Sequence, residues 1–276
     1  ISATTTYWVT AWNGSCESIL RTAIVAKYNP LLTLTFTPAA PAVCGENTII
    51  ALTAAGDIET VNLINETFES GGLGVFSTVN NDANSAAIDN ITKWQNYTSV
   101  FVPTTTNVWF PAVSSGFGTN KFALTLSDSN PYATNPTENS LVLTTAVNST
   151  AFLDLTLTFK LYYSRYLDDG DVSYSEYATI DVSTDGGATY PTTLQTLIAD
   201  TGIGTRFSAV SFNLNAFINQ TNLKIRVRNH SWTGNGLLPD GVAVHDILLS
   251  GTRPLNTSFA WSGASLPDVY RNAGCP

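Results

Sequence analysis

Four acidic side chains lie close together in one stretch of the chain, and such carboxylates can either act in acid–base catalysis or bind a cation. They are Asp168, Asp169, Asp171 and Glu176. A glycosidase needs two carboxylates that face each other across a cleft, and a cluster along one loop does not supply that arrangement. Two interpretations therefore stay open: a solvated acidic loop, and a cation site made of carboxylate oxygens.

Histidine is the other residue type that could support catalysis, and the chain has two, His230 and His245. A serine hydrolase needs a serine, a histidine and an acid that converge in space, and no GxSxG, HExxH or P-loop motif accompanies these residues. His245 lies in an expected strand with one buried face, which favours a hydrogen-bonded structural role. We interpret segment 229–232, which contains His230, as surface loop. The sequence therefore predicts that the chain is not an enzyme.

Tryptophan offers a third kind of chemistry, because a flat indole ring can stack on the face of a sugar. Trp94, Trp109 and Trp232 are the candidates for such a carbohydrate platform. Large aromatic residues in β-sandwiches belong more often to the core than to an exposed platform. We take Trp232 and Trp94 as candidate ligand-binding residues, with a core position as the alternative.

The overall composition narrows the class of protein. Charged residues make up 12% of the chain, against roughly 25% in an average soluble domain, and the net charge is −9. This acidity argues against nucleic-acid binding, which needs a basic face. No apolar run approaches the ~20 residues that span a bilayer, so we expect no membrane insertion. We expect an extracellular β-protein that is a piece of a longer polypeptide, with any export signal outside it.

The elements that must position these residues are β-strands. In the stretch Ser175–Tyr190, Ala178, Ile180 and Val182 alternate with polar residues, which predicts a half-buried strand. The following Asp-Gly-Gly predicts a tight hairpin turn. Segments 152–163, 222–229 and 241–251 repeat the pattern, and no helix is expected. The sequence thus predicts two antiparallel sheets packed face to face, with these residues buried: Leu155, Leu157, Phe159, Ile180, Val182, Ile225, Val227, Val244 and Ile247.

Several of these segments also carry a family resemblance. The sequence NETFESG at 65–71 resembles the first strand of the MAM-like jelly rolls of the "choice-of-anchor J" type, found in secreted Bacteroidota proteins. Later landmarks of that family follow in order at 141–143, 178–190, 223–227 and 243–247. The resemblance covers residues 60–253 and implies an all-β, antiparallel jelly-roll β-sandwich. One departure is His245, which stands where such domains usually have the first Asp of a hydrophobic-Asp-Asp-Ile run.

The flanking segments resemble parts of Ig-like repeats. Residues 1–40 resemble the end of one repeat followed by a linker, and this resemblance favours a strand over a helix for the ambiguous segment 19–28. Residues 41–59 and 254–276 resemble two halves of a split Ig-like repeat, into which residues 60–253 would be inserted. A tandem arrangement is the alternative. On the insertion hypothesis Cys44 and Cys275 would form a disulfide, whereas Cys44 could otherwise bond beyond the fragment.

The resemblance implies a function. Ig-like repeats combined with a jelly roll look like gliding-motility adhesins of the SprB type, which are exported by the type IX secretion system. The chain is then a non-enzymatic module of a secreted, cell-surface adhesin that acts as spacer and contact surface. Its partners would be neighbouring Ig-like repeats, the secretion machinery during export and surface glycans. The alternative is a carbohydrate-binding module of a secreted hydrolase or protease.

The resemblance also implies a structural calcium ion between the first and last strands of the jelly roll. The matching positions are Glu69 and Asp246, with Asp128 as a third ligand and Asp82 as a fourth. Both main carboxylates are expected in strands with apolar neighbours, where a cation would relieve the repulsion between like charges. Oxygen ligands favour calcium over zinc. The alternative is that both carboxylates accept backbone hydrogen bonds and bind nothing.

Overall fold

The computed structural model describes most of the central part of the chain and short pieces elsewhere. The described residues are 5–9, 22–26, 35–37, 53–81, 83, 90, 92–97, 100–101, 113–114, 121–126, 136–165, 175–202, 207–232 and 241–255. The chain divides into two compact units, Ile1–Ile58 with Leu255–Pro276, and Glu59–Pro254. The insertion of residues 60–253 into an Ig-like repeat made of 41–59 and 254–276 stays a prediction.

The described strands of the first unit form two small antiparallel pairs. Strand β1 (Thr5–Val9) pairs with β2 (Thr22–Ala26), and β3 (Thr35–Thr37) pairs with β4 (Thr53–Ala55). The choice of a strand for the ambiguous segment 19–28 is confirmed for Thr22–Ala26. Cys44 and Cys275 lie outside the described residues, so their disulfide stays a prediction.

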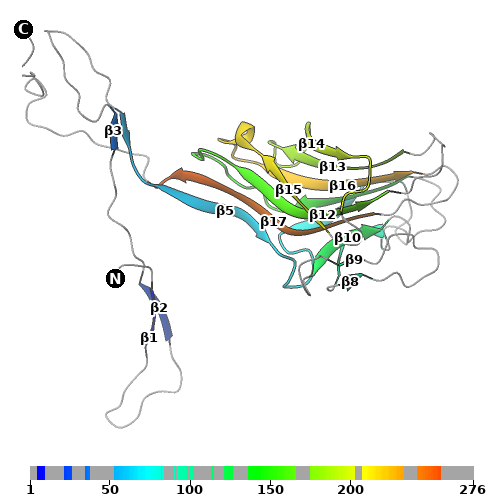
Figure 1. The fold of residues 1–276 in the computed structure, drawn as a ribbon, viewed down its shortest axis with the longest axis horizontal. Helices are drawn as coiled ribbons and strands as arrows, with labels where there is room; N and C mark the ends of the chain where they lie inside the picture. Colours follow the sequence, from blue (N-terminus) through cyan, green and yellow to red (C-terminus); the bar gives the residue numbers. More distant parts are fainter. Residues whose placement is uncertain are drawn as a thin grey trace, which may run out of the picture. The chain divides into compact units, whose positions relative to one another are not determined.

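The second unit is built from two antiparallel sheets (Figure 1). The six-stranded sheet has the order β15 (Ser208–Asn213), β12 (Thr156–Ser164), β17 (Gly241–Pro254), β10 (Phe122–Leu126) and β7 (Gln95–Tyr97), with β5 (Ile58–Glu66) also paired to β17. The five-stranded sheet has the order β14 (Thr192–Leu197), β13 (Ser175–Ser183), β16 (Lys224–Trp232), β11 (Thr137–Leu143) and β6 (Phe76–Asn80). A short pair, β8 (Val100–Phe101) with β9 (Val113–Ser114), and a 3₁₀ turn, η1 (Asn215–Phe217), complete the described elements.

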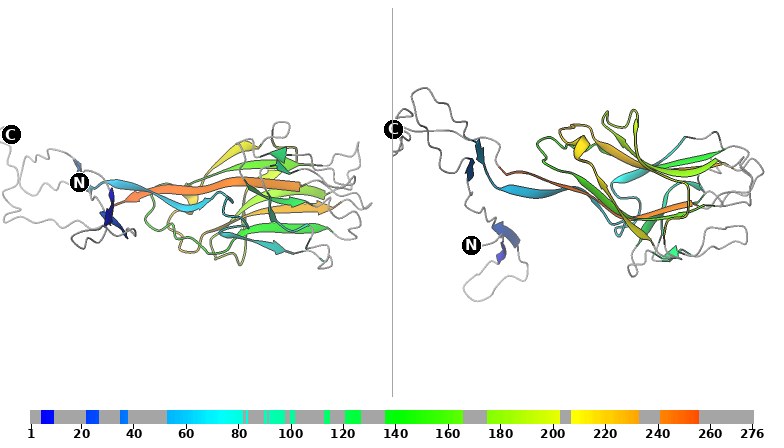
Figure 2. Two further views of the ribbon diagram at one scale, coloured as in Figure 1. Left: turned by 90° about the horizontal axis from the view of Figure 1, so that it is seen from below. Right: turned by 45° about the horizontal axis from the view of Figure 1, so that its top comes forward.

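The two sheets form two layers, best separated in the right-hand view of Figure 2, and they enclose one hydrophobic core. Both sheets supply alternate residues to it, as the period of a strand requires. All nine residues predicted to be buried are at most 4% exposed, which confirms the sandwich and its interior. The chain is therefore an all-β protein with an antiparallel sandwich as its main unit.

Strand β13 differs from the half-buried strand that its sequence predicts. Ala178, Ile180 and Val182 face the core, but Thr179 and Asp181 on the opposite face are also no more than 4% exposed. They are covered because the longer side chains of the neighbouring strand β16 lie across them. Alternation in the sequence identified the inner face, and it could not show that the outer face was covered too.

The long strand β17 contains an irregularity that shapes the six-stranded sheet. Its register against β12 shifts, so that Thr158 lies opposite Leu248 while Lys160 lies opposite His245. Asp246 and Ile247 therefore share one position on the partner strand, which is a β-bulge. Asp246 has a φ of 51°, a left-handed conformation that a non-glycine residue rarely adopts. The bulge directs the Asp246 side chain away from the regular pleat.

Candidate functional site

The resemblance implied that Glu69 lies in a strand, and this is wrong. Strand β5 ends at Glu66, whose buried carboxylate accepts hydrogen bonds from the backbone N–H groups of Phe68, at 2.6 Å, and Val75, at 3.0 Å. Gly74, with a φ of +57°, passes so close to Glu66 that a Cβ atom there would lie 1.7 Å from Oε2. This carboxylate holds residues 67–75 in turns. Glu69 is exposed within them and accepts the Lys121 backbone N–H at 2.7 Å.

Asp246 and His245 form a charged group at the bulge of β17. The Asp246 carboxylate makes an ion pair with the Lys160 ammonium from β12, and its Oδ1 lies 3.1 Å from Nε2 of His245. His245 is fully buried. Burial lowers the pKa of its imidazole, an effect that the carboxylates of Asp246 and Glu69 oppose. The imidazole also makes a hydrogen bond with the backbone of Lys121, which fits the structural role that the sequence favoured.

These side chains do not fit a calcium site as they stand. A calcium ion on Asp246 would occupy the place of the Lys160 ammonium, which already neutralises that carboxylate. No group of three or more His, Cys, Asp or Glu side chains that could hold a metal occurs within the described part of the chain. Asp128 and Asp82 lie outside those residues. The calcium ion therefore stays a prediction, and its set of ligands competes with an internal ion pair.

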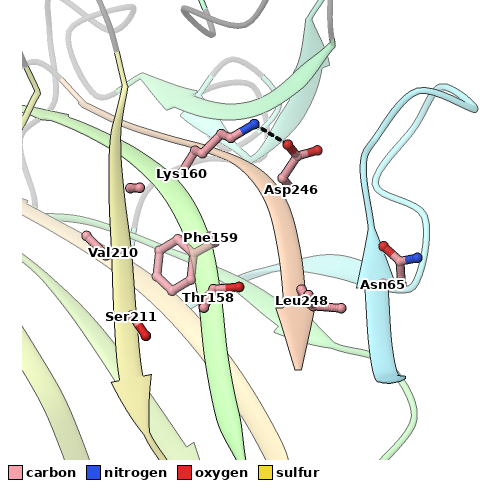
Figure 3. Close-up of a pocket in the computed structure, with 9 residues that line it drawn as sticks. Asn65, Thr158, Phe159, Lys160, Val210, Ser211, Asp246 and Leu248 are labelled. Carbon is pink, nitrogen blue, oxygen red and sulfur yellow. Dashed lines mark hydrogen bonds and ion pairs between the residues drawn. The ribbon is translucent and has the colours of Figure 1, made fainter. Parts of the chain in front are cut away.

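A pocket of about 460 Å³ opens beside this ion pair (Figure 3). Lys160 reaches across from β12 to Asp246 at one end, with Ser211 of β15 on one flank and Asn65 of β5 on the other. The full lining is Asn65, Thr158, Phe159, Lys160, Ala209, Val210, Ser211, Asp246 and Leu248. Sequence analysis found only Asp246 of this group. A lone lysine within the apolar run of 152–163 was the remaining signal.

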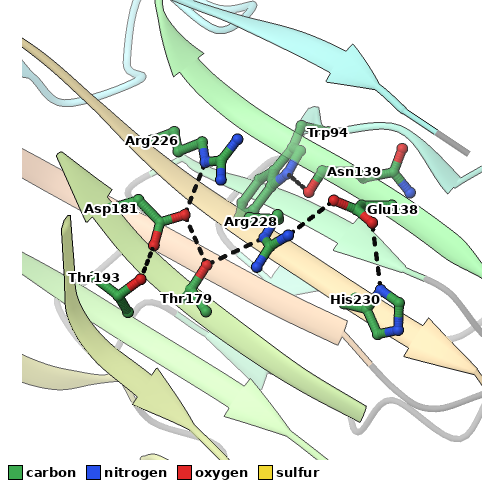
Figure 4. A network of polar contacts seen from close by, with 9 residues as sticks. All are labelled: Trp94, Glu138, Asn139, Thr179, Asp181, Thr193, Arg226, Arg228 and His230. Carbon is green, nitrogen blue, oxygen red and sulfur yellow. Dashed lines mark hydrogen bonds and ion pairs between the residues drawn. The ribbon is translucent and has the colours of Figure 1, made fainter. Parts of the chain in front are cut away.

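The outer face of the five-stranded sheet carries a second group of polar side chains, which we call the polar face (Figure 4). It consists of Glu138, Tyr177, Thr179, Asp181, Tyr190, Thr193, Arg226, Arg228 and His230. The strand register places them opposite one another, with Arg226 across from Asp181 and Arg228 across from Thr179. On β16 they alternate with the core residues Ile225 and Val227, so the period of the strand was their signal.

Hydrogen bonds connect the ionic groups of the polar face into one chain. Asp181 accepts Arg226 Nε at 2.8 Å, Thr193 Oγ1 at 2.8 Å and Thr179 Oγ1 at 2.9 Å. Thr179 in turn accepts Arg228 Nε at 3.3 Å, and Arg228 donates to Glu138 at 3.0 Å. The contact with His230, 3.4 Å from its Nδ1, is the main cause that lowers the pKa of Glu138 to about 2, with Arg228 adding to it. The charges on this face are therefore paired and held in fixed positions.

Two tyrosine rings complete the polar face. Tyr177 stacks on His230 with ring centroids 4.7 Å apart and planes inclined by 19°. The Arg226 guanidinium lies 4.1 Å from the centre of the Tyr190 ring, within cation–π distance.

His230 belongs to strand β16, and its sequence-based assignment to a surface loop is wrong. Asn229 and Ser231 are residue types that are common in turns, but here they continue the regular pairing of β16 with β13 and β11.

Of the two tryptophans predicted to bind ligands, Trp94 is buried and Trp232 has no described side chain. Trp94 is 1% exposed and donates its indole N–H to the backbone oxygen of Asn139 at 3.2 Å. A buried ring cannot stack on a sugar, so the platform role of Trp94 is wrong and the core alternative holds. Trp232 ends strand β16, and its side chain lies outside the described residues. Of the acidic cluster, only Glu176 has a described side chain, and it is 5% exposed.

Comparisons with known proteins do not assign a function to these groups. No protein-family profile and no curated protein matches the chain. Among solved structures, it is similar to the carbohydrate-binding module TmCBM61 in complex with β-1,4-galactotriose, with 12% identity over 68% of this chain and 97% of that one and a TM-score of 0.40. It is also similar to the K3 adhesin domain of Lys-gingipain from Porphyromonas gingivalis, with 14% identity, 68% and 98% coverage and a TM-score of 0.40.

An enzyme shows a similar likeness. An apo cyclase from Fischerella sp. is 14% identical, over 72% of this chain and 98% of the cyclase, with a TM-score of 0.34. Likenesses at these identities and TM-scores assign neither ligand nor activity. The expectation that this chain is not an enzyme therefore stays a prediction. No helix among the described residues is long and apolar enough to cross a membrane.

Proposed function

We propose that the chain is a non-enzymatic module of a secreted, cell-surface adhesin and acts as spacer and contact surface. The observation that carries this proposal is the polar face. Arginine and tyrosine are the residue types that most often dominate binding energy at protein surfaces. On this face Tyr177 and Arg228 are partly exposed. Stacking on His230 orders the Tyr177 ring, and contacts with Thr179 and Glu138 order the Arg228 side chain. A surface ordered in advance loses less conformational entropy on binding.

The wider setting of the module follows from the sequence resemblance and forms part of the proposal. Neighbouring Ig-like repeats would flank it in the same polypeptide, and the type IX secretion system of a Bacteroidota organism would export it. Gliding motility would then use it as one of many surface modules. Any sequence that precedes or follows residues 1–276 in the full gene product tests this point, because further Ig-like repeats are expected there and a catalytic domain would contradict them.

Adhesion under flow tests the contact role. Beads carrying the full 276-residue chain are passed over glass, agar and mucin-coated surfaces, and the retained fraction is counted. We expect retention on at least one surface, and a loss of about tenfold with Tyr177→Thr, as for a residue at the centre of a contact. Tyr7→Thr is the matched control, because Tyr7 is an exposed tyrosine in a strand outside the polar face. Equal retention of both variants would reject the polar face as the contact surface.

A carbohydrate-binding module attached to a secreted hydrolase or protease is the second candidate function. The pocket beside the bulge of β17 favours it, because a concave site with polar groups at its edge suits a small ligand better than a protein surface. The two candidates use opposite faces of the sandwich. They can therefore be separated by variants that alter one face at a time.

A further inference from the structure

The charged groups of the pocket neutralise each other. Lys160 and Asp246 are the only ionisable side chains among its lining residues, and they form an ion pair. Both side chains are partly buried, with exposed fractions of 22% and 34%. A charged ligand would have to compete with one member of the pair for the other, whereas a neutral ligand can hydrogen-bond to both. The pocket therefore favours a ligand without net charge.

Three neutral polar side chains around the pocket are uncommitted. Asn65, Thr158 and Ser211 come from three different strands, β5, β12 and β15. None of the three side chains makes a hydrogen bond to another described residue, in contrast to Asp181, Thr179 and Arg228 of the polar face. A ligand rich in hydroxyl groups could bond to them as well as to the ion pair.

The remaining wall of the pocket is apolar. Ala209 of β15 lies opposite Lys160 and shares its face of the sheet, and Leu248 of β17 lies opposite Thr158 on the same face. Phe159 and Val210 also border the pocket but face the core (Figure 3). Hydroxyl groups would gain nothing from this wall, but a C–H face would be removed from water against it. The lining thus combines one apolar surface with hydrogen-bonding groups at the edge. A ligand that matches it has both kinds of surface on a small, neutral body.

The backbone at Asp246 is consistent with a built site. Its left-handed conformation, with a φ of 51°, has a steric cost for aspartate, which has a Cβ atom, that glycine would not have. Such strain and β-bulges both occur preferentially where a side chain must be re-aimed at a functional site. Here the bulge places the carboxylate at the end of the pocket beside Lys160.

We propose that this pocket binds a neutral saccharide of one or two pyranose rings. Its volume of about 460 Å³ lies within the range of roughly 300–1,000 Å³ that is usual for small-molecule sites. The C–H face of the sugar lies against Leu248 and Ala209, and its hydroxyls bond to the Lys160–Asp246 pair and the uncommitted side chains. The proposal rests on the role of the chain as a binding module, and it names the ligand class of a face that adhesion through Tyr177 does not use.

Titration of the full chain with defined sugars tests the proposal. The probes are D-galactose, D-glucose, D-xylose and their β-1,4-linked disaccharides, with D-glucuronic acid and D-glucosamine as charged counterparts. Binding is followed by calorimetry and by NMR chemical shifts. We expect at least one neutral sugar to bind with a Kd below about 10 mM, and its charged counterparts to bind at least about tenfold more weakly.

Variants locate the binding site. Ala209→Trp fills the pocket from an exposed position on the edge strand β15 and should weaken binding at least about tenfold. Leu153→Trp adds a similar bulk at a position that is 54% exposed and is not among the lining residues, and it should leave the Kd unchanged. Unchanged binding by Ala209→Trp, equal binding of charged sugars, or no binding of any neutral sugar would each overturn the proposal. A loss through Trp232→Ala with Ala209→Trp unaffected would place a sugar site at the end of β16 instead.

The two proposed sites fail separately. Tyr177→Thr should reduce bead adhesion while leaving sugar binding intact, and Ala209→Trp should do the reverse for any surface that presents no matching sugar. If adhesion is absent and a neutral sugar still binds, the adhesin role is rejected and the saccharide site stands. If adhesion depends on Tyr177 and no sugar binds, the saccharide site alone is rejected.

Discussion

The polar face and the pocket lie on opposite sheets of one sandwich, and they treat their polar groups in opposite ways. On the polar face, the register of β13 against β16 is regular over nine pairs from Ser175 to Ser183, and it places Asp181 directly across from Arg226 and Tyr177 across from His230. At the pocket, the register of β12 against β17 is broken by the bulge at Asp246. The polar face also has a register shift, between β13 and β14 at Asp181, but there Arg226 and Thr193 bond the carboxylate within the protein. The bulge at Asp246 instead borders a pocket.

The largest expected effect comes from opening the polar face at its most buried charge. Asp181 is 1% exposed, and Arg226→Ala would leave that carboxylate without its ionic partner. Breaking a buried pair from one side costs about 3 kcal/mol. Urea unfolding should show this loss, while Lys160→Ala at the pocket should cost less than ~1 kcal/mol because its pair is partly solvated. Equal losses at both places would mean that the two faces do not differ in how tightly their charges are held.

The second expected effect concerns the bulge itself. Asp246→Gly and Asp246→Ala both remove the carboxylate, but only glycine adopts a φ of 51° without steric cost. We expect the glycine variant to be more stable by about 1 kcal/mol in urea unfolding. At Thr196, an exposed residue of strand β14 that does not have a positive φ, the order should reverse by about 0.5–1 kcal/mol. The same order at both positions would show that the bulge is not strained.

Comparison of these two regions also shows what the sequence could predict. The alternation of Ile180 and Val182 was enough to identify an inner strand, because period two is a local property of the chain. The bulge gave no such signal, since Asp246 is an aspartate where a glycine would have indicated a left-handed backbone. The partners of Glu138 could not be predicted either, because His230 is 92 residues away and only the register of β11 and β16 brings them together.

The predicted ligand residues illustrate the same limit. Composition cannot distinguish a core tryptophan from an exposed one, and Trp94 turned out to be enclosed by both sheets' side chains and bonded to Asn139. For Glu69 the signal was present, because Gly71, Gly72 and Gly74 after it indicate turns and all three have positive φ. The resemblance to the first strand of a jelly roll outweighed that local pattern, and the strand in fact ends at Glu66.

A smaller effect should appear when the polar face is titrated with acid. The pKa of Glu138 is lowered from 4.5 to about 2 in the folded chain, chiefly by its hydrogen bond with His230. A carboxyl group with a lowered pKa binds fewer protons in the folded state, so its stabilising contribution is present above pH ~4.5 and is lost as the pH falls towards about 2. Solvent screening limits this contribution to about 1 kcal/mol or less.

Thermal unfolding at about pH 5 and about pH 2.5 checks this effect. The first pH lies above the range in which Glu138 loses its stabilising contribution, and the second lies within that range. Glu138→Gln should reduce the fall in Tm but not abolish it, since the pKa of Asp185 is also lowered, mainly by the Ser183 hydroxyl. A variant whose Tm falls as steeply as that of the wild type would remove Glu138 from the acid response. The stacked Tyr177–His230 pair should remain intact in the variant, which near-UV circular dichroism can follow.

The smallest expected effect is that of calcium, and it depends on which cation neutralises Asp246. Lys160 already forms an ion pair with this carboxylate, and a calcium ion would have to displace the ammonium group. An ion that binds only to the native state raises Tm by mass action, and the rise is larger when the ion binds more tightly. Because calcium must displace the lysine, its binding is weakened and the rise in Tm is small. We expect excess calcium or chelator to shift the Tm of the wild type by less than ~1 °C. Lys160→Met removes the ammonium group from Asp246 and should make Tm respond to calcium, if Lys160 is what excludes the ion. A clear rise in the wild type that Asp246→Ala abolishes would instead restore calcium as the ion between the two carboxylates.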